Sequence, residues 1–355
     1  MSGTATVGDR RLPGLLLFDL PRELEAATPP EARGLTRDGV RMMVATRRDG
    51  ALVHSAFGDL PRFLQSGDLV VINTSGTLPA ARRGSDDAGR PIDVHLSTQL
   101  PAGLSSLELR RDGRPYLDGV AGASVSLPAG GRVHLLAPQA RHPLGVRLWI
   151  GQVELPRPLQ AYLAAHGSPI RYDYVHSPWP LASYQNVYAT EPGSAEMASA
   201  GRPFTADVIM RLVARGVGVT PLVLHTGVAS FEASEPPYPE YYRVPEATAC
   251  RVNEAHADGR RVVAVGTTVV RALETVADDH GTVRGGEGWT ETVITAERGV
   301  RAVDGMLTGW HEPQASHLAV LEAVAGRELV AASYQSALAE RYLWHEFGDV
   351  HLILP

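Results

Sequence analysis

The segment 261–274 has the residue types and the spacing of a site that binds an anion. A run of apolar residues ends at Gly266, and a helical pattern starts within two residues of it. Ligands of open α/β sheets bind at the carboxyl ends of strands, and the free N–H groups at a helix start attract carboxylates and phosphates. Thr267 and Thr268 can cap this helix or bind a ligand, and Arg271 shares the face of Thr268. These residues form a candidate anion site, although an ordinary capped helix with an Arg–Glu surface pair also fits the pattern.

A second strand end carries a polar residue and a glycine. The run 222–224 is apolar, and His225 and Gly227 follow it. A lone histidine at such a position is as often a hydrogen-bonded structural residue as a catalytic one, so both interpretations stay open. Asp304 and His311 lie in a loop that precedes a predicted helix. His311 does not belong to the zinc-binding His-Glu-x-x-His pattern, because the next histidine follows at six residues rather than four, and we expect no metal site.

The segment 191–205 is rich in Gly and Ala and precedes another predicted helix. Small residues let a ligand approach the backbone closely, although a flexible loop has the same composition. The chain contains neither a Walker sequence nor a full G-x-G-x-x-G pattern. A nucleotide triphosphatase or a Rossmann dehydrogenase therefore lacks support.

The elements that must position these residues fall into two regions with different predicted secondary structure. Over 67–155, short β-rich segments, the first at 68–72, alternate with Gly and Pro turns, which is typical of a small barrel or sandwich. From 184 onward, strands alternate with helices, which predicts a largely parallel sheet covered on both faces. A long loop rich in proline and aromatic residues, 167–181, separates the two, and long ordered loops are often functional.

We therefore expect an α/β fold. A layered α/β sandwich domain over 1–66 plus 156–355 would hold the main ligand cleft, and an inserted small β-barrel domain would span 67–155. The predicted helices are 57–64, 159–165, 206–215, 245–258, 268–277, 316–325 and 329–344. The predicted strands outside the β-rich block are 40–45, 51–56, 218–225, 261–265, 291–295 and 351–354.

Composition excludes several kinds of protein. The 355 residues carry 33 basic and 39 acidic side chains, a net charge of 33 − 39 = −6, which argues against non-specific coating of nucleic acid. All basic residues are Arg, so a lysine Schiff base or a P-loop lysine is excluded. Cys250 is the only cysteine, which excludes an intrachain disulfide, and we expect it to be a small core residue.

The chain shows no sign of a membrane span or an export signal. No apolar run approaches the roughly 20 residues that cross a bilayer. Arg10 and Arg11 precede a short apolar stretch, but no small-residue cleavage site follows. We expect a cytoplasmic protein with no membrane partner.

These segments resemble one family, the S-adenosylmethionine:tRNA ribosyltransferase-isomerases of queuosine biosynthesis, over nearly the whole chain. The Ala-Val-Gly-Thr-Thr block at 264–268, followed by Arg271 and Glu274, is specific, and the ordered set of landmarks is more so. The other landmarks are Phe18–Pro21, Gly67–Leu69, Tyr184-Gln185, Val187-Tyr188, Pro192-Gly193, Ala200-Gly201, Phe204, Leu224-His225, Gly227, Val303-Asp304, Thr308, His311, Pro313 and Gly348-Asp349.

The resemblance implies a reaction. Members transfer and isomerise the ribosyl group of S-adenosylmethionine, a co-substrate, onto 7-aminomethyl-7-deazaguanine in tRNA, giving epoxyqueuosine-tRNA, adenine and methionine, with no metal. By this resemblance His225, Asp304 and His311 are candidates for proton transfer or ribose binding, although the substrate amine can itself act as the base. The candidate S-adenosylmethionine-binding residues are Gly201, Arg202, Phe204, Gly227, Gly266, Thr267, Thr268 and Arg271. We expect a monomer whose partner is tRNA.

The chain departs from the family pattern at several polar positions. Two arginines are missing around 73–81, where the family has Asn-Asn-Thr-Arg-x-x-Pro-Ala-Arg, and three histidines are missing at 200–204 and 237–240. Glu312 stands where the family has Leu, and 343–345 reads Leu-Trp-His in place of Arg-Phe-Phe. Lost Arg and His residues most directly affect contacts to RNA. Two alternatives therefore stay open: a paralogue that uses S-adenosylmethionine on a small-molecule acceptor, and an inactive module that binds a nucleoside or tRNA.

Overall fold

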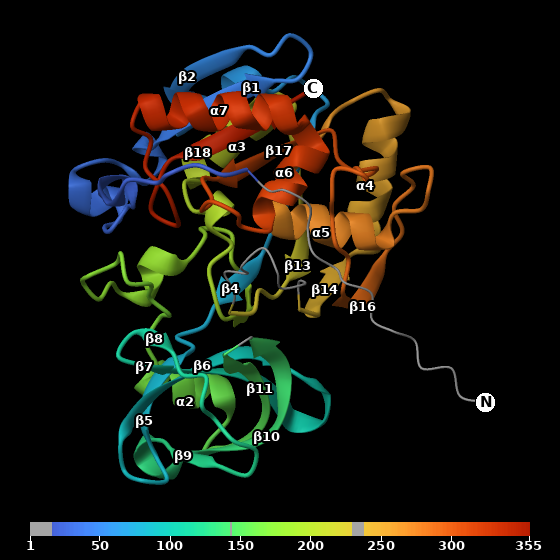
Figure 1. Cartoon of the computed structure of the whole chain (residues 1–355). Helices are drawn as coiled ribbons and strands as arrows, with labels where there is room; N and C mark the ends of the chain where they lie inside the picture. The colour runs from blue at the N-terminus through green and yellow to red at the C-terminus, as the bar shows by residue number, and fades with distance from the viewer. Residues whose placement is uncertain (1–15, 143, 229–237) are drawn as a thin grey trace.

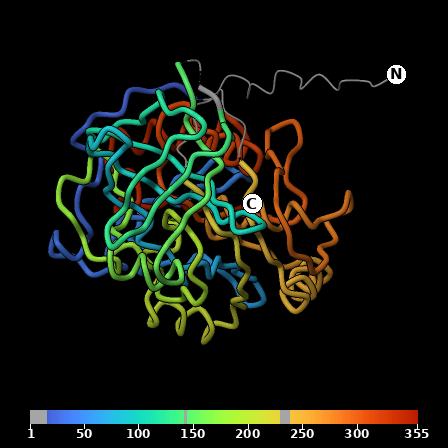
Figure 2. The backbone as a smooth tube through the Cα atoms, turned by 90° about the horizontal axis from the view of Figure 1, so that it is seen from below, coloured from blue at the N-terminus to red at the C-terminus, as the bar shows by residue number. Residues whose placement is uncertain are grey.

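A computed structural model describes residues 16–142, 144–228 and 238–355 of the chain. It shows a larger α/β part and, below it, a smaller barrel of strands (Figure 1). In the view from below, the strands of the barrel lie in front of the larger part (Figure 2). Within the described ranges, no helix is both long enough and apolar enough to cross a membrane.

The larger part is built on a mixed nine-stranded sheet. Its order is β16-β14-β13-β3-β15-β17-β18-β1-β2. The strands are β1 (Arg41–Thr46), β2 (Leu52–Ala56), β3 (Leu69–Asn73), β13 (Gly218–Leu224), β14 (Glu240–Val244), β15 (Val262–Val265), β16 (Gly286–Thr290), β17 (Gly305–Gly309) and β18 (Val350–Leu354).

The expectation of a largely parallel sheet is right only for the centre. β13, β3, β15 and β17 run parallel to one another, as does the pair β18 and β1. The remaining pairs are antiparallel, including the predicted hairpin of β1 and β2. Of these antiparallel pairs, β1 and β2 are joined by a short turn, whereas β13–β14, β14–β16 and β17–β18 are joined through longer segments, so no hairpin turn in the sequence marks them.

Helices cover both faces of this sheet, as expected. Along β3, Leu69 and Val71 point into one core and Val70 and Ile72 into the other, because successive side chains of a strand alternate between faces. The helices of the first face are α4 (Glu246–Ala257), α5 (Thr267–Val276), α6 (His317–Ala325) and α7 (Arg327–Ala339). Those of the second face are α1 (Leu60–Phe63) and α3 (Ala206–Ala214).

The smaller part is the expected β-barrel. The ring β11-β10-β9-β5-β6-β7 closes through pairing of β11 with β7, and every pairing in it is antiparallel. Helix α2 (Leu159–His166) packs on it, and the Tyr162 hydroxyl donates a hydrogen bond of 2.7 Å to the Pro128 carbonyl. The barrel strands are β5 (Ala81–Asp86), β6 (Pro91–Gln99), β7 (Leu104–Arg111), β9 (Ser124–Ser126), β10 (Arg132–His142) and β11 (Gly145–Glu154), with β8 (Arg114–Pro115) paired outside the ring.

One strand expected in the barrel lies elsewhere. The segment 68–72 forms β3, in the middle of the large sheet between β13 and β15. Its four consecutive apolar residues are typical of a strand buried on both faces, which a parallel sheet provides. The chain then pairs β4 (Ser75–Thr77) with β12 (Glu191–Ser194) before it enters the barrel. Where the domains divide, expected at 66/67 and 155/156, stays a prediction.

Three smaller expectations were wrong. The strand predicted at 291–295 is β16, at 286–290, whose glycines weaken the strand signal. The last helix ends at Ala339 rather than at residue 344, because Arg341 has a left-handed backbone, with φ of 54°. Cys250 is exposed on α4 instead of lying in the core.

The buried histidine of the last strand predicts how stability depends on pH. His351 is fully buried, neither ring nitrogen has a hydrogen-bond partner among the residues that the structure describes, and the ring stacks on Trp310 with centroids 4.7 Å apart. Burial lowers the pKa of His351 to about 3. Below pH 6.5 the unfolded chain therefore binds a proton that the folded chain rejects, and folding becomes less favourable as the pH falls.

We expect His351→Phe, which keeps the ring and removes the titration, to flatten this dependence. Between pH 7.5 and 5 the wild-type chain should lose about 2 kcal/mol of unfolding free energy more than the variant. Urea unfolding at a series of pH values measures this difference. Parallel curves for the two proteins would contradict this, because they would show that the pKa of His351 is the same in the folded and the unfolded chain.

Candidate active site

A cavity of about 240 Å³ lies at the carboxyl ends of β15 and β17. The start of α5, the loop after β17 and the turn η8 (Ser199–Gly201) line it, together with the segment after β13. The barrel adjoins this segment, since the Val228 N–H donates a hydrogen bond of 2.8 Å to Ser97 Oγ of β6. The cavity thus lies where the large sheet, its helix α5 and the barrel come together.

The Gly266 turn opens onto this cavity, as the sequence predicted. Gly266 has φ of 91° and ψ of 156°, a backbone that favours glycine, and it immediately precedes α5. Its N–H donates to the Leu307 carbonyl at 2.8 Å, which fixes the turn against β17. Thr267 and Thr268 are the first residues of the helix, whose leading N–H groups lack intrahelical acceptors. The helix dipole adds partial positive charge at the same point.

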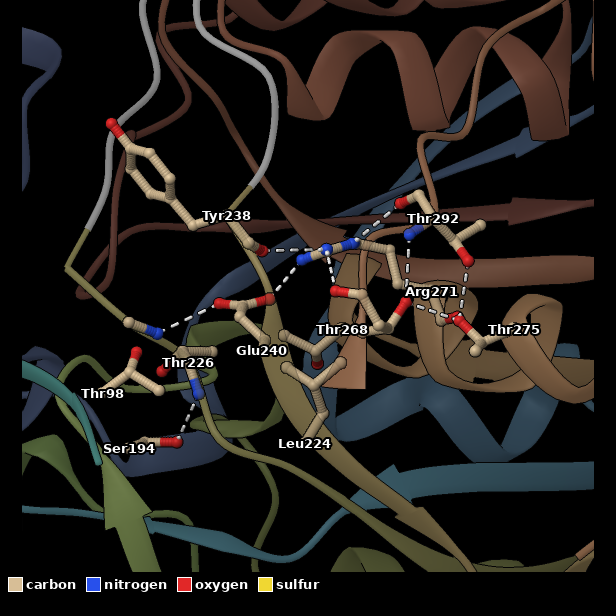
Figure 3. Close-up of polar contacts among 12 residues, drawn as sticks. Thr98, Ser194, Leu224, Thr226, Tyr238, Glu240, Thr268, Arg271, Thr275 and Thr292 are labelled. Carbon is tan, nitrogen blue, oxygen red and sulfur yellow. Dashed lines mark hydrogen bonds and ion pairs between the residues drawn. The ribbon is translucent and has the colours of Figure 1, made fainter. Parts of the chain in front are cut away.

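Arg271 also lines the cavity, and it is already ion-paired. Its Nη1 pairs with a carboxylate oxygen of Glu240, and Nε donates to the Thr292 carbonyl at 3.2 Å (Figure 3). Among the described residues, the contacts of Nη2 are long, 3.4 Å to the carbonyls of Tyr238 and Thr290. Such contacts are beyond the usual hydrogen-bond range, so Nη2 is the nitrogen best able to donate a hydrogen bond to a ligand oxygen.

Glu240 was missed by the sequence analysis and connects two predicted residues. One carboxylate oxygen accepts the Gly227 N–H at 3.0 Å, and the other pairs with Arg271. Gly227 therefore lines the cavity with its backbone. Glu240 holds this backbone near Arg271 because it bonds to both residues. The signal was present, because the family-like stretch at 237–240 loses its histidines and keeps this glutamate.

The alternative of an Arg271–Glu274 surface pair is not what the structure shows. The carboxylate of Glu274 is buried and pairs with Arg298 at 2.8 Å. It also accepts the N–H groups of Arg301 and Ala302, at 2.6 and 2.8 Å. Glu274 thus anchors the loop before β17 to α5. The ion-pair partner of Arg271 is Glu240 instead.

His311 is the predicted proton carrier that the structure brings to the cavity. Its Nε2 lies 2.8 Å from Thr308 Oγ1, and its ring stacks on His317 with centroids 4.6 Å apart and planes at 3°. Burial, and then nearby histidines, lower the pKa of His311 well below its ordinary value. Burial lowers the pKa of His317 to about 4. Both rings are therefore neutral near pH 7 and able to accept a proton or a hydrogen bond.

His225 lies outside the set of cavity-lining residues. Its Nδ1 is 2.7 Å from Ser75 Oγ, which in turn lies 2.6 Å from Ser194 Oγ. Gly193 packs directly on the ring, where a Cβ would come within 2.3 Å. His225 thus connects the end of β13 to the β4–β12 pair, and its role in proton transfer stays a prediction.

Asp304 lies at the opposite edge of the sheet. It precedes β17, whereas Gly266 and His311 follow strands. Its carboxylate accepts the Val262 N–H at 2.8 Å and lies 3.5 Å from His256 Nε2. Burial raises the pKa of Asp304, but the bonds from His256 and Val262 outweigh this and lower it. The structure does not bring Asp304 together with the other candidates.

Gly201, Arg202 and Phe204 lie behind the cavity wall rather than on it. Arg202 is buried, and its guanidinium bonds the Ser183 carbonyl at 2.9 Å and Glu31 at 2.8 Å. Phe204 packs edge-to-face on Phe57 in the second core. The preceding residues 198–200 line the cavity instead. Binding by these three predicted residues stays a prediction, and their contacts position the η8 turn.

For several lining residues the sequence predicted no individual role. They come from distant segments, which no local pattern connects: Tyr172, Tyr174, Tyr184, Glu196, His317, His345 and Glu346. The aromatic loop contains the first two, Tyr184 is a family landmark, and Glu196 lies in the Gly- and Ala-rich segment 191–205. Within the described part of the chain, no cluster of three or more His, Cys, Asp or Glu side chains is placed to hold a metal ion.

Comparison with known proteins assigns the chain to a family. A family model described as "Queuosine biosynthesis protein" matches residues 15–353. A protein of Symbiobacterium thermophilum named S-adenosylmethionine:tRNA ribosyltransferase-isomerase is 38% identical over 360 residues, covering 95% of this chain and 98% of its own. A protein of that name from Moorella thermoacetica is 33% identical over 366 residues, with the same coverage, 95% and 98%.

A solved structure agrees in fold. The S-adenosylmethionine tRNA ribosyltransferase of Thermotoga maritima has a TM-score of 0.52 and 26% identity, covering 95% of this chain and 99% of its own. The fold and the site define an α/β protein with a barrel beside a ligand cavity. The chain belongs to the queuosine biosynthesis protein family.

The Arg271–Glu240 pair supplies a test of the site's architecture. Both side chains are mostly buried, 13% and 14% exposed, so breaking one partner leaves a charge poorly solvated. In a double-mutant cycle with Arg271→Gln and Glu240→Gln, we expect a coupling of roughly 2 kcal/mol in urea unfolding. The control cycle uses Arg41 and Glu340, an exposed pair 3.9 Å apart, for which at most about 0.5 kcal/mol is expected. Equal couplings in the two cycles would contradict a buried pair at the cavity.

Proposed function

We propose that this chain is an S-adenosylmethionine:tRNA ribosyltransferase-isomerase. It would transfer and isomerise the ribosyl group of S-adenosylmethionine onto 7-aminomethyl-7-deazaguanine in tRNA, releasing adenine and methionine. Relatives that carry this enzyme name match nearly the full chain. The observation that carries the proposal is the Gly266 turn, whose helix start opens onto the cavity beside Arg271.

The anion site suits the methionyl carboxylate of S-adenosylmethionine. A carboxylate at the start of α5 would accept N–H groups of Thr267 and Thr268 and face the positive end of the helix dipole. Arg271 Nη2, with its two long contacts, adds a charge-assisted donor. Glu240 keeps this guanidinium in place through Nη1, so the donor is oriented before the substrate binds.

Proton transfer is the second requirement of this chemistry. The sulfonium acidifies the neighbouring ribose 5′ carbon, so a base must remove its proton. His311 is neutral in its buried position and lines the cavity, which makes it the protein group best placed for this step. When the Thr308 hydroxyl accepts from Nε2, the lone pair of Nδ1 is left to accept a proton. The amine of the acceptor base is the alternative proton acceptor.

The charge of the cavity favours a second candidate, an enzyme that uses S-adenosylmethionine on a small cationic acceptor. Among the described lining residues, carboxylates outnumber guanidinium groups, with Glu196, Glu240, Glu312 and Glu346 against Arg271. Such a lining attracts an amine but repels phosphate. The absence of the family's arginines at 76 and 81 points the same way, since arginine side chains commonly contact the phosphates and bases of nucleic acids.

A product assay separates these candidates. The purified chain is mixed with S-adenosylmethionine, with and without tRNA that carries 7-aminomethyl-7-deazaguanine, and adenine and methionine are measured by chromatography and mass spectrometry. We expect adenine only with this tRNA. A sample shown to be folded that releases none would overturn the proposal and leave the small-acceptor enzyme or a binding module.

Arg271 should contribute to the affinity for S-adenosylmethionine. Removing a charge-assisted hydrogen bond costs about 1.5–3 kcal/mol, so Arg271→Ala should raise the Kd by about 10- to 100-fold in calorimetry. Arg48→Ala, in the exposed turn between β1 and β2, serves as the control and should change it less than twofold. An unchanged affinity in folded Arg271→Ala would remove the carboxylate role from this residue.

A further inference from the structure

One wall of the cavity is a stack of three rings. Tyr172 and Tyr174 stack with centroids 5.9 Å apart and planes at 19°. Tyr174 stacks in turn on His345, at 4.1 Å and 12°. All three residues line the cavity, and they come from segments more than 170 residues apart. Because Tyr174 and His345 already face each other, a planar heterocycle can stack only on an outer ring face of this stack.

The edge of this wall is built to hydrogen-bond. The Tyr174 hydroxyl donates to one oxygen of Glu346, and the Tyr172 hydroxyl donates to Glu196. Burial raises the pKa of both tyrosines well above their ordinary value, so they remain donors. Glu346 thus places a carboxylate at the rim of the stack, where it lines the cavity and can accept an N–H group of a ligand.

An unsatisfied donor lies on the same wall. Tyr184 lines the cavity and is only 3% exposed, and its hydroxyl has no partner in the described part of the chain. Burial, and next the charge of Glu346, raise its pKa to about 12, so the hydroxyl carries its proton. A buried hydroxyl without a partner costs free energy, which a ligand that accepts its hydrogen bond would recover.

This donor and acceptor suit the Watson–Crick edge of a nucleobase. Enzymes that modify a nucleobase take it out of the stack, place it against aromatic side chains and recognise its Watson–Crick edge by hydrogen bonds. A guanine-type edge has a carbonyl oxygen beside N–H donors. Tyr184 and Glu346 supply a complementary donor and acceptor. An adenine edge also has a donor beside an acceptor, so the measurements on tRNA and on S-adenosylmethionine below decide between the two bases.

We propose that the Tyr174–His345 stack binds the acceptor base of the tRNA, with Glu346 accepting its N–H groups and Tyr184 donating to its carbonyl oxygen. This inference rests on the proposed function and names the part of the cavity that selects the acceptor. The position is suitable, because the His345 N–H donates to the Trp310 carbonyl at 3.3 Å, next to His311. The wall, His311 and the Gly266 turn, the proposed site of S-adenosylmethionine, thus line one cavity.

The test uses Glu346→Gln and the nearly isosteric Tyr184→Phe, with Glu340→Gln on the surface as the control. Adenine release is measured against the concentration of tRNA bearing the aminomethyl base, and the Kd for S-adenosylmethionine is measured by calorimetry without tRNA. We expect kcat/KM for the tRNA to fall at least about tenfold in both cavity variants, as for loss of a hydrogen bond in a buried site. The Kd for S-adenosylmethionine should change less than twofold, and Glu340→Gln should resemble wild type.

Three results would overturn the inference. A tenfold weaker affinity for S-adenosylmethionine with unchanged use of tRNA would assign the wall to the donor substrate. Unchanged values for both substrates in Tyr184→Phe, which alters a single oxygen, would show that the wall recognises neither. If the wild-type chain itself releases no adenine with this tRNA, the proposed function fails first and the inference falls with it, which distinguishes the two failures.

Discussion

The parallel direction of β13, β3, β15 and β17 is the constraint on which the site depends. Because these strands run the same way, their carboxyl ends meet at one edge, and the residues that follow them are brought together from distant positions. Asn73, at the end of β3, reinforces this edge. Its side chain bonds both the N–H and the carbonyl of Leu224 at the end of β13, at 3.0 and 2.8 Å. The Gly266 turn and the His311 loop then follow the next two strands.

The same constraint explains how the barrel reaches the cavity. After β3 the chain passes directly through β4 into β5, so the barrel starts at the carboxyl edge rather than at the far side of the sheet. It returns through the aromatic loop that contains Tyr172 and Tyr174, and β12 pairs beside β4. Ser97 of the barrel then holds Val228, next to Gly227 of the cavity wall. The barrel is therefore fixed beside the site by the segments that enter and leave it and by the bond between Ser97 and Val228.

The sequence predicted well those features that are formed by residues adjacent in the chain. The Gly266 turn, its helix and the preceding buried strand are adjacent in sequence, so glycine, apolar run and helix periodicity were sufficient to find them. The barrel was recognised from its turns, but β3 was assigned to it, because an apolar strand does not reveal which sheet it joins. The prediction that Asp304 and His311 share a loop was wrong, because strand β17 lies between them. One residue therefore lies at the cavity and the other at the opposite edge of the sheet.

Residues that meet through tertiary contacts were beyond such reasoning. The Glu240–Arg271 pair requires β14 to lie beside α5, and the Tyr174–His345 stack joins the aromatic loop to the segment after α7. The resemblance to a family included Tyr184 among its landmarks without a role, and it missed the other residues of the wall because they are not among those landmarks.

The most direct test of this account is the structure of the chain in complex with S-adenosylmethionine. The account predicts the methionyl carboxylate at the start of α5, within hydrogen-bond distance of the N–H groups of Thr267 and Thr268 and of Arg271 Nη2. A carboxylate found instead beside Tyr174 and His345, with the Gly266 turn making no contact to the ligand, would contradict it.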